Sequence, residues 1–329
     1  MWFRFMCPVG RETLKWCTSP MYKPKPKAVL LLGPTGVGKT ALSLKLAEAV
    51  NGEIVSADSR LFYRGMDIGT AKPTLHERKR VPHHLVDVAD PDEHWSLSRF
   101  LEAADAAIVD IARRGKVPII VGGTGQFVRA LLEGWEIPEI DEKPRLRQAL
   151  LALAETQGSA RLHAWLEGVD PEAAQKIDGR NVRRTVRAIE VILSTGRKFS
   201  AQRMATGARY EFIVLGLTLP RPMLYQRIDE RVDAMFAAGL LDEVRGLLKK
   251  YPPDSRCFSA IGYPQAIRVL KGEMTEGEAK IEIKRRTRVF VRGQAAWFRH
   301  DAPGITWIEQ DETADVRAVN AVREFIGIR

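Results

Sequence analysis

The chain has 329 residues, of which 45% are hydrophobic and 28% are charged, as in ordinary globular proteins. It contains no run of about 18 apolar residues, so no membrane-spanning helix is predicted. Its first twenty residues lack the apolar centre of a signal peptide, and its three cysteines have neither disulfide nor zinc-site spacing. These features predict a cytoplasmic protein. Because Met21 restarts the chain just before the first strand pattern, we expect residues 1–27 to be a disordered extension.

The net charge of +10 favours a polyanionic partner. Residues 180–209 hold eight bases and one acid, and residues 284–299 hold six bases and no acid. Three aromatic residues, Phe290, Trp297 and Phe298, are interleaved with the second group. Bases among aromatics suit contact with RNA phosphates and unstacked bases, whereas the simpler alternative is a solvated helix face.

Strand and helix patterns alternate through the first half of the chain. Short runs rich in β-branched residues predict strands at 28–33, 52–58, 117–123 and 211–219. Amphipathic patterns predict helices at 39–50, 96–114 and 125–133. This alternation predicts an α/β fold, a parallel sheet with helices on both faces.

Residues 138–199 interrupt that alternation with helical patterns alone. We expect a small all-helical insertion domain there, placed between the two parts of the α/β core, 28–137 and 200–329. In its last helix the apolar spacing predicts a packed face made by Val182, Val186, Ile189 and Leu193, with several arginines on another face. Residues 220–299 are predicted to be mostly helical, and "VPHHLVDV" is predicted to be a loop with structural histidines.

The segment "GPTGVGKT", between the first strand and the first helix, matches the phosphate-binding P-loop pattern. Its glycines let backbone N–H groups approach phosphate oxygens, and the helix N-terminus favours negative charge. Lys39 supplies a positive charge, and Thr40 offers a hydroxyl to Mg²⁺. The predicted phosphate site comprises Gly33, Pro34, Thr35, Gly36, Val37, Gly38, Lys39 and Thr40. The core is therefore predicted to be P-loop NTPase-like, although the motif alone does not name the substrate.

Asp58 follows the second predicted strand, and in a sheet of this kind that position lies near the phosphate loop. From its position alone it could bind Mg²⁺, act as a general base or cap a helix. The wider segment "SADSRLFYRGMDIGTAKP", together with "VGGTGQF", "RRTVRAIEV", "IGYPQ" and "TRVFVRGQAAWFR", resembles the bacterial tRNA dimethylallyltransferases. The motifs follow the family's order over about residues 27–300.

This resemblance implies transfer of a dimethylallyl group from dimethylallyl diphosphate to N6 of the adenosine next to the anticodon in tRNA. The loop would then hold a departing diphosphate with Mg²⁺, and Asp58 would be the general base. Arg231 is implied to bind the diphosphate, with a surface ion pair as the alternative. The implied tRNA contacts are Asp58, Ser59, Arg60, Leu61, Thr124, Arg147, Arg183, Arg184 and Arg187. For Thr124 the alternative is a helix cap, and Arg145 competes with Arg147.

The sequence departs from the family pattern at three places: Leu61 replaces a glutamine, Arg183 replaces a glutamine, and Phe127 replaces a tyrosine. These changes affect recognition of the base and leave the reaction intact. Rival functions are an adenylate isopentenyltransferase, a P-loop nucleotide kinase that binds ATP, and a non-catalytic RNA-binding ATPase. We expect a monomer.

Overall fold

The computed structural model describes residues 25–137, 143–202, 204–205, 207–297, 299 and 301–328. The predicted extension therefore lies mainly outside the described residues, and Lys27 already begins the first strand. No helix in the described ranges is long and apolar enough to cross a membrane.

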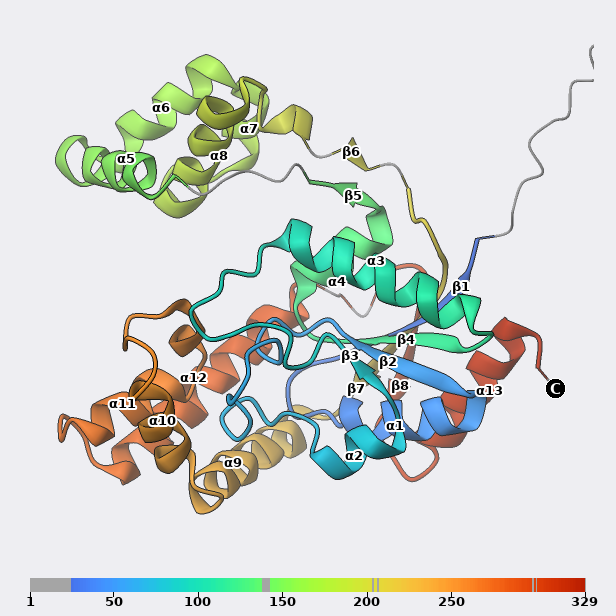
Figure 1. The fold of residues 1–329 in the computed structure, drawn as a ribbon. Helices are drawn as coiled ribbons and strands as arrows, with labels where there is room; N and C mark the ends of the chain where they lie inside the picture. Colours follow the sequence, from blue (N-terminus) through green and yellow to red (C-terminus); the bar gives the residue numbers. More distant parts are fainter. Residues whose placement is uncertain are drawn as a thin grey trace, which may run out of the picture.

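The core is a parallel sheet of six strands in the order β3-β2-β4-β1-β7-β8, which confirms the predicted α/β fold (Figure 1). β1 pairs with β4 on one side and with β7 on the other, and all neighbours run parallel. The strands are β1 (Lys27–Leu32), β2 (Gly52–Ser56), β3 (His83–His84), β4 (Val117–Val121), β7 (Glu211–Thr218) and β8 (Ile305–Glu309).

Helices cover both faces of this sheet because the central strands are apolar on both sides. Alternate residues of β1 enter two different hydrophobic clusters, Leu30 in one and Leu31 in the other. Helices α3 (Leu97–Arg113) and α4 (Gly125–Glu133) pack in the first cluster. Helices α1 (Lys39–Val50) and α13 (Ala314–Ile326) pack in the second.

Most of the remaining helices of the core are grouped together beside the sheet (Figure 1). The short α2 (Leu75–Arg80) begins with a capping box at Thr74 and Glu77. After β7 the chain forms α9 (Arg221–Ala237), α10 (Leu240–Leu248), α11 (Tyr263–Leu270) and α12 (Glu276–Ala295), with a 3₁₀ turn, η2 (Arg256–Ser259), before α11. The basic segment 284–299 is thus helical only as far as Ala295.

Residues 143–199 form a separate helical unit with its own hydrophobic cluster. It consists of α5 (Pro144–Gln157), α6 (Ser159–Val169), α7 (Pro171–Lys176) and α8 (Val182–Thr195), followed by the 3₁₀ turn η1 (Ser200–Gln202). Figure 1 shows the unit apart from the sheet, joined to it by two chain segments. Those segments pair as the short antiparallel strands β5 (Trp135–Glu136) and β6 (Met204–Ala205).

Two details differ from the sequence predictions. Leu193 is 49% exposed and does not belong to the packed face of α8, although Val186 and Ile189 are buried there. The reason is that Thr185, Ala188 and Glu190 are buried as well, which turns the packed face away from Leu193. The loop predicted at "VPHHLVDV" contains β3, which pairs with β2 at the sheet edge.

Candidate active site

The phosphate loop links β1 to α1 and has the backbone geometry that its glycines permit. Gly38 caps α1 at φ 104°, a left-handed conformation in which other residues are disfavoured. The ammonium group of Lys39 donates to the carbonyl oxygens of Gly33, at 2.8 Å, and Pro34, at 2.9 Å. The loop is therefore closed around its own lysine, and Thr40 lies exposed in the first turn of α1.

The carboxyl ends of β2 and β4 place two more predicted residues beside this loop. Asp58 follows β2, and its carboxylate accepts a hydrogen bond from the Arg60 N–H at 3.0 Å. Turn residues, not a helix, follow Asp58, which removes the helix-cap alternative. Thr124 precedes α4, where its hydroxyl makes no cap bond and instead accepts from the Ser59 N–H at 3.4 Å. The structure thus brings Asp58, Ser59 and Thr124 together.

Lys39, Asp58 and Arg231 form a mixed-charge group close enough to influence one another's ionisation. Burial lowers the pKa of Lys39 to about 8, Asp58 opposes that shift, and Arg231 adds to it. Burial also lowers the pKa of Arg231, again opposed by Asp58. Two cations beside a single carboxylate leave a net positive site, which suits an incoming polyanion.

Arg231 reaches the site from α9 and is held by the loop 67–70. Its guanidinium donates to the Thr70 carbonyl at 3.1 Å. In the described structure Arg231 forms no salt bridge with Asp229 or Glu230, so the ion-pair alternative is wrong. Asp229 instead pairs with Arg288, and Glu230 accepts a hydrogen bond from Gln226. The loop lies within the segment "SADSRLFYRGMDIGTAKP", but its contact with Arg231 was not predicted from the sequence.

Glu243 of α10 anchors that loop. Its carboxylate accepts from the N–H groups of Asp67 at 2.8 Å, Ile68 at 2.6 Å and Gly69 at 3.1 Å, and from the Tyr263 hydroxyl at 2.7 Å. These partners lie far from Glu243 in sequence, and no motif spacing connects them.

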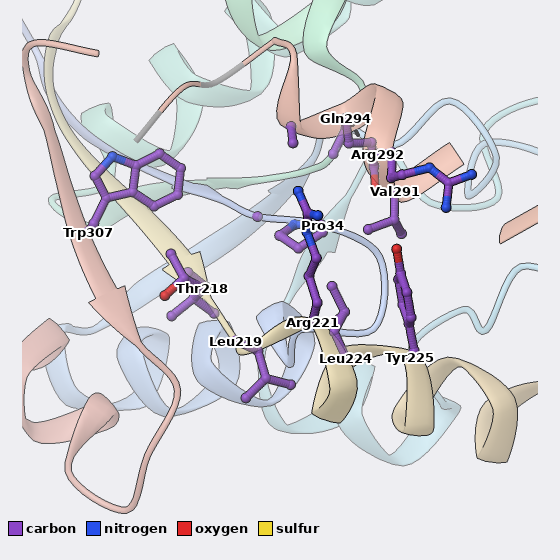
Figure 2. Close-up of a pocket in the computed structure, with 14 residues that line it drawn as sticks. Pro34, Thr218, Leu219, Arg221, Leu224, Tyr225, Val291, Arg292, Gln294 and Trp307 are labelled. Atoms are coloured by element: carbon purple, nitrogen blue, oxygen red, sulfur yellow. Dashed lines mark hydrogen bonds between the residues drawn. The ribbon is translucent and has the colours of Figure 1, made fainter. Parts of the chain in front are cut away.

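An apolar cavity of about 250 Å³ adjoins the start of the phosphate loop. Figure 2 shows that Pro34 lines it, together with Arg221, Leu224 and Tyr225 of α9, residues of the last turns of α12, and Trp307 of β8. Gly123, next to Thr124, also lines it. The cavity therefore offers an apolar space bounded by the phosphate loop.

An aromatic cluster supports the loop that carries Asp58. The rings of Phe62 and Phe127 stack with centroids 5.9 Å apart, and those of Phe100 and Phe127 with centroids 4.2 Å apart. Phe127 is buried in this cluster, which accounts for a residue without a hydroxyl at that position.

The predicted tRNA contacts of the helical unit fall into two groups. Arg183 and Arg184 are exposed on α8, and within the described residues neither forms a salt bridge. Arg147 and Arg187 instead bond the buried carboxylate of Glu190, at 2.7 Å and 3.1 Å. Arg145 is exposed at the start of α5.

The donor set at the phosphate loop fits a magnesium ion that arrives with its phosphate ligands. Among the described residues, no group of three or more His, Cys, Asp or Glu side chains could hold a metal ion. The Thr40 hydroxyl is a hard oxygen donor of the kind that Mg²⁺ accepts alongside phosphate and water.

Comparison with known proteins identifies a family. Residues 61–301 match a family model described as IPP transferase. The chain is 48% identical over 300 residues to the tRNA dimethylallyltransferase of Roseiflexus sp. (strain RS-1), covering 91% of this chain and 98% of that protein. It is 52% identical over 282 residues to that of Roseiflexus castenholzii, covering 85% and 92%.

Solved structures agree with these matches. The full-length tRNA isopentenylpyrophosphate transferase from Bacillus halodurans aligns with a TM-score of 0.67 and 38% identity, over 92% of this chain and 96% of that one. A eukaryotic dimethylallyltransferase acting on tRNA aligns with a TM-score of 0.79 and 29% identity, over 92% and 80%. Fold, sequence and phosphate site together show that this chain belongs to the IPP transferase family of tRNA dimethylallyltransferases.

Proposed function

We propose that this enzyme transfers a dimethylallyl group from dimethylallyl diphosphate to N6 of the adenosine next to the anticodon in tRNA. The observation that carries this proposal is the group Lys39, Asp58 and Arg231, two cations and one carboxylate at the mouth of the phosphate loop. A kinase transfers the phosphoryl group itself, whereas here the phosphates leave together as diphosphate.

In the proposed reaction the bond between C1 of the prenyl group and the diphosphate oxygen breaks, and its electron pair stays on the diphosphate. The N–H groups of the loop, Lys39 and Arg231 stabilise the charge that develops there. Thr40 would hold Mg²⁺, which, when bound, neutralises charge on the diphosphate oxygens. The apolar cavity beside Pro34 is suited to the five-carbon chain.

The adenosine amine then forms a bond to C1 and loses a proton. That amine is a weak nucleophile because its lone pair is delocalised into the ring. Asp58 accepts the proton, and general-base help of this kind contributes ~10²–10⁴-fold. Thr124, joined to the Asp58 turn through Ser59, lies where it could orient the base.

The tRNA is proposed to lie between the helical unit and the exposed side of α12. Arg183 and Arg184 on α8 and Arg285 and Arg292 on α12 are exposed bases. Phe290, elsewhere on α12, is 48% exposed and could stack on an unpaired base. The target base leaves its stack to enter the site, at a cost that is smaller in a loop than in a duplex.

One assay tests the reaction. Labelled dimethylallyl diphosphate is incubated with unmodified tRNA or AMP, and ATP consumption is followed in parallel. We expect label on tRNA and release of diphosphate. Label on AMP alone would identify an adenylate transferase, and ADP release without labelled RNA would contradict the proposal.

Replacement of the proposed base gives a second test. Asp58→Asn should lower kcat by ~10²–10⁴-fold while the Kd for tRNA stays within a few-fold of wild type. The matched control is Asp254→Asn, an exposed carboxylate on the loop after α10, which should leave both unchanged. An equal loss of turnover and tRNA affinity in Asp58→Asn would refute its role as a base.

A further inference from the structure

The last turn of α12 reaches the active site through one buried side chain, Gln294. Its amide oxygen accepts from the Thr35 N–H of the phosphate loop at 2.9 Å. Its amide nitrogen donates to the Gly123 carbonyl at 3.0 Å. A single side chain therefore bridges the loop after β1 and the turn after β4.

The contact between α12 and this turn is unusually close. A Cβ atom at Gly123 would lie 2.5 Å from the Gln294 amide nitrogen, and one at Gly125 would lie 2.2 Å from the ring of Trp297. A larger residue at Gly123 would therefore displace the Gln294 amide, and one at Gly125 would displace Trp297. The turn that carries Thr124 is held by the end of α12 as well as by the Ser59 N–H.

We propose that Gln294 is a positioning residue, which sets the phosphate loop and the turn that carries Thr124 at the separation the reaction needs. This inference rests on the proposed function. Only a side chain with both a donor and an acceptor can hold the Thr35 N–H and the Gly123 carbonyl at once, and a primary amide supplies both. Gln294 also lines the cavity proposed for the prenyl chain, but in this proposal it acts through these two backbone groups.

Loss of the bridge should affect both the site proposed for the diphosphate and the turn that carries Thr124, because it frees the two backbone segments that Gln294 connects. The loop residues after Thr35 are those proposed to hold the diphosphate, and Thr124 adjoins the turn of Asp58. Misplacement of reacting groups by about 1 Å can cost on the order of 10²-fold in rate. Gln294→Met, which is similar in size but cannot bridge, should raise the dissociation constant for pyrophosphate and lower kcat, each by about 10- to 100-fold.

Gln294→Glu provides a readout that a space-filling role would not give. Ionised glutamate can accept from the Thr35 N–H, but it repels the Gly123 carbonyl. Protonated glutamic acid has the shape of the amide and restores the donor. The affinity of Gln294→Glu for pyrophosphate, relative to wild type at the same pH, should therefore recover as the pH falls, whereas that of Gln294→Met should stay low at every pH.

The experiment measures magnesium pyrophosphate binding by titration calorimetry between pH 5 and 8, together with prenyl transfer to tRNA and thermal unfolding, on the full chain. Gln226→Met, an exposed glutamine on α9 bonded to Glu230, is the matched control and should behave as wild type. Wild-type affinity and kcat in Gln294→Met would overturn the inference, as would Gln294→Glu without recovery at low pH. A wild-type protein that transfers no prenyl group would instead refute the proposed function, and the inference with it.

Discussion

Lys39 lies among groups with opposite effects on its charge. Burial in the phosphate loop lowers its pKa to about 8 from an ordinary value of 10.5, and the neighbouring Asp58 carboxylate limits that shift. The folded state therefore releases this proton at a lower pH than the unfolded chain. Between these values the unfolded chain binds more protons, so this group makes folding more favourable as the pH rises. An arriving diphosphate favours the charged form, which couples binding to proton uptake above pH 8.

That coupling predicts that the affinity for diphosphate decreases at alkaline pH. The wild-type affinity for pyrophosphate should fall as the pH rises through about 8, because free enzyme then has to take up a proton on Lys39. Lys39→Arg keeps its charge throughout this range, so its affinity should not show this decrease. Any change that remains in Lys39→Arg measures the ionisation of pyrophosphate itself and can be subtracted. Identical pH profiles for the two proteins would contradict the assignment.

At the scale of elements, the site depends on contacts between α10, α9 and the loop 67–70. One carboxylate, Glu243, organises the loop through three N–H groups, and Thr70 then fixes Arg231. Lys72 closes the same loop from within: its buried ammonium bonds Asp67 and Asp87 at 2.7 Å and 2.6 Å. The arginine of the site is thus oriented by a segment that contacts no substrate in the proposed mechanism.

Neutralising Glu243 should therefore weaken both the fold and donor binding. Hydrogen bonds to a charged group are worth about 1.5–3 kcal/mol, so Glu243→Gln should lower the free energy of unfolding by an amount of that order. It should also raise KM for dimethylallyl diphosphate and leave the Kd for tRNA unchanged. Denaturant titration and initial rates check these outcomes against Glu312→Gln, an exposed control on the segment before α13. A change in tRNA affinity alone would show that the loop serves the RNA instead.

At the scale of the whole molecule, the proposed RNA surface divides between two folding units. The exposed arginines of α8 belong to a unit with its own hydrophobic cluster, and those of α12 belong to the core. Arg147 and Arg187 already neutralise the buried Glu190, and their main contribution is expected to be to the unit's stability. Arg183 and Arg184, for which the described structure gives no salt bridge, are the α8 arginines proposed to contact phosphates.

The double variant Arg183→Ala and Arg184→Ala should weaken tRNA binding and reduce its salt dependence. Each lost phosphate contact lowers the slope of log Kd against log salt by ~0.7–0.9. A double variant with the same charge change, Lys79→Ala and Lys249→Ala on α2 and after α10, should leave that slope near wild type. Filter binding at several salt concentrations measures both. Equal slopes for the two double variants would exclude α8 from the interface.

The sequence predicted correctly those helices whose ends are determined by residues next to them in the chain. The boundaries of α1 and α4 agree with the sequence prediction because a Gly-rich turn precedes each helix and a left-handed residue, Asn51 or Gly134, ends it. No element was predicted after residue 299. Strand β8 was not predicted because it pairs with β7, which lies about ninety residues earlier in the chain. For the same reason the roles of Gln294 and Glu243 were not predicted. Gln294 bonds Thr35 and Gly123, which are 259 and 171 residues away in sequence. Glu243 bonds N–H groups of the loop 67–70, which are at least 174 residues away. Asp58 and Thr124 could be found because motifs mark them.

The paired strands β5 and β6 mean that the helical unit leaves and rejoins the core at one place. Gly134 and Gly207 lie against each other there, so close that a Cβ on the first would meet the carbonyl oxygen of the second at 2.2 Å. Because the unit has a single attachment point and its own hydrophobic cluster, residues can be inserted into it or deleted from it without a change in the strand order of the sheet.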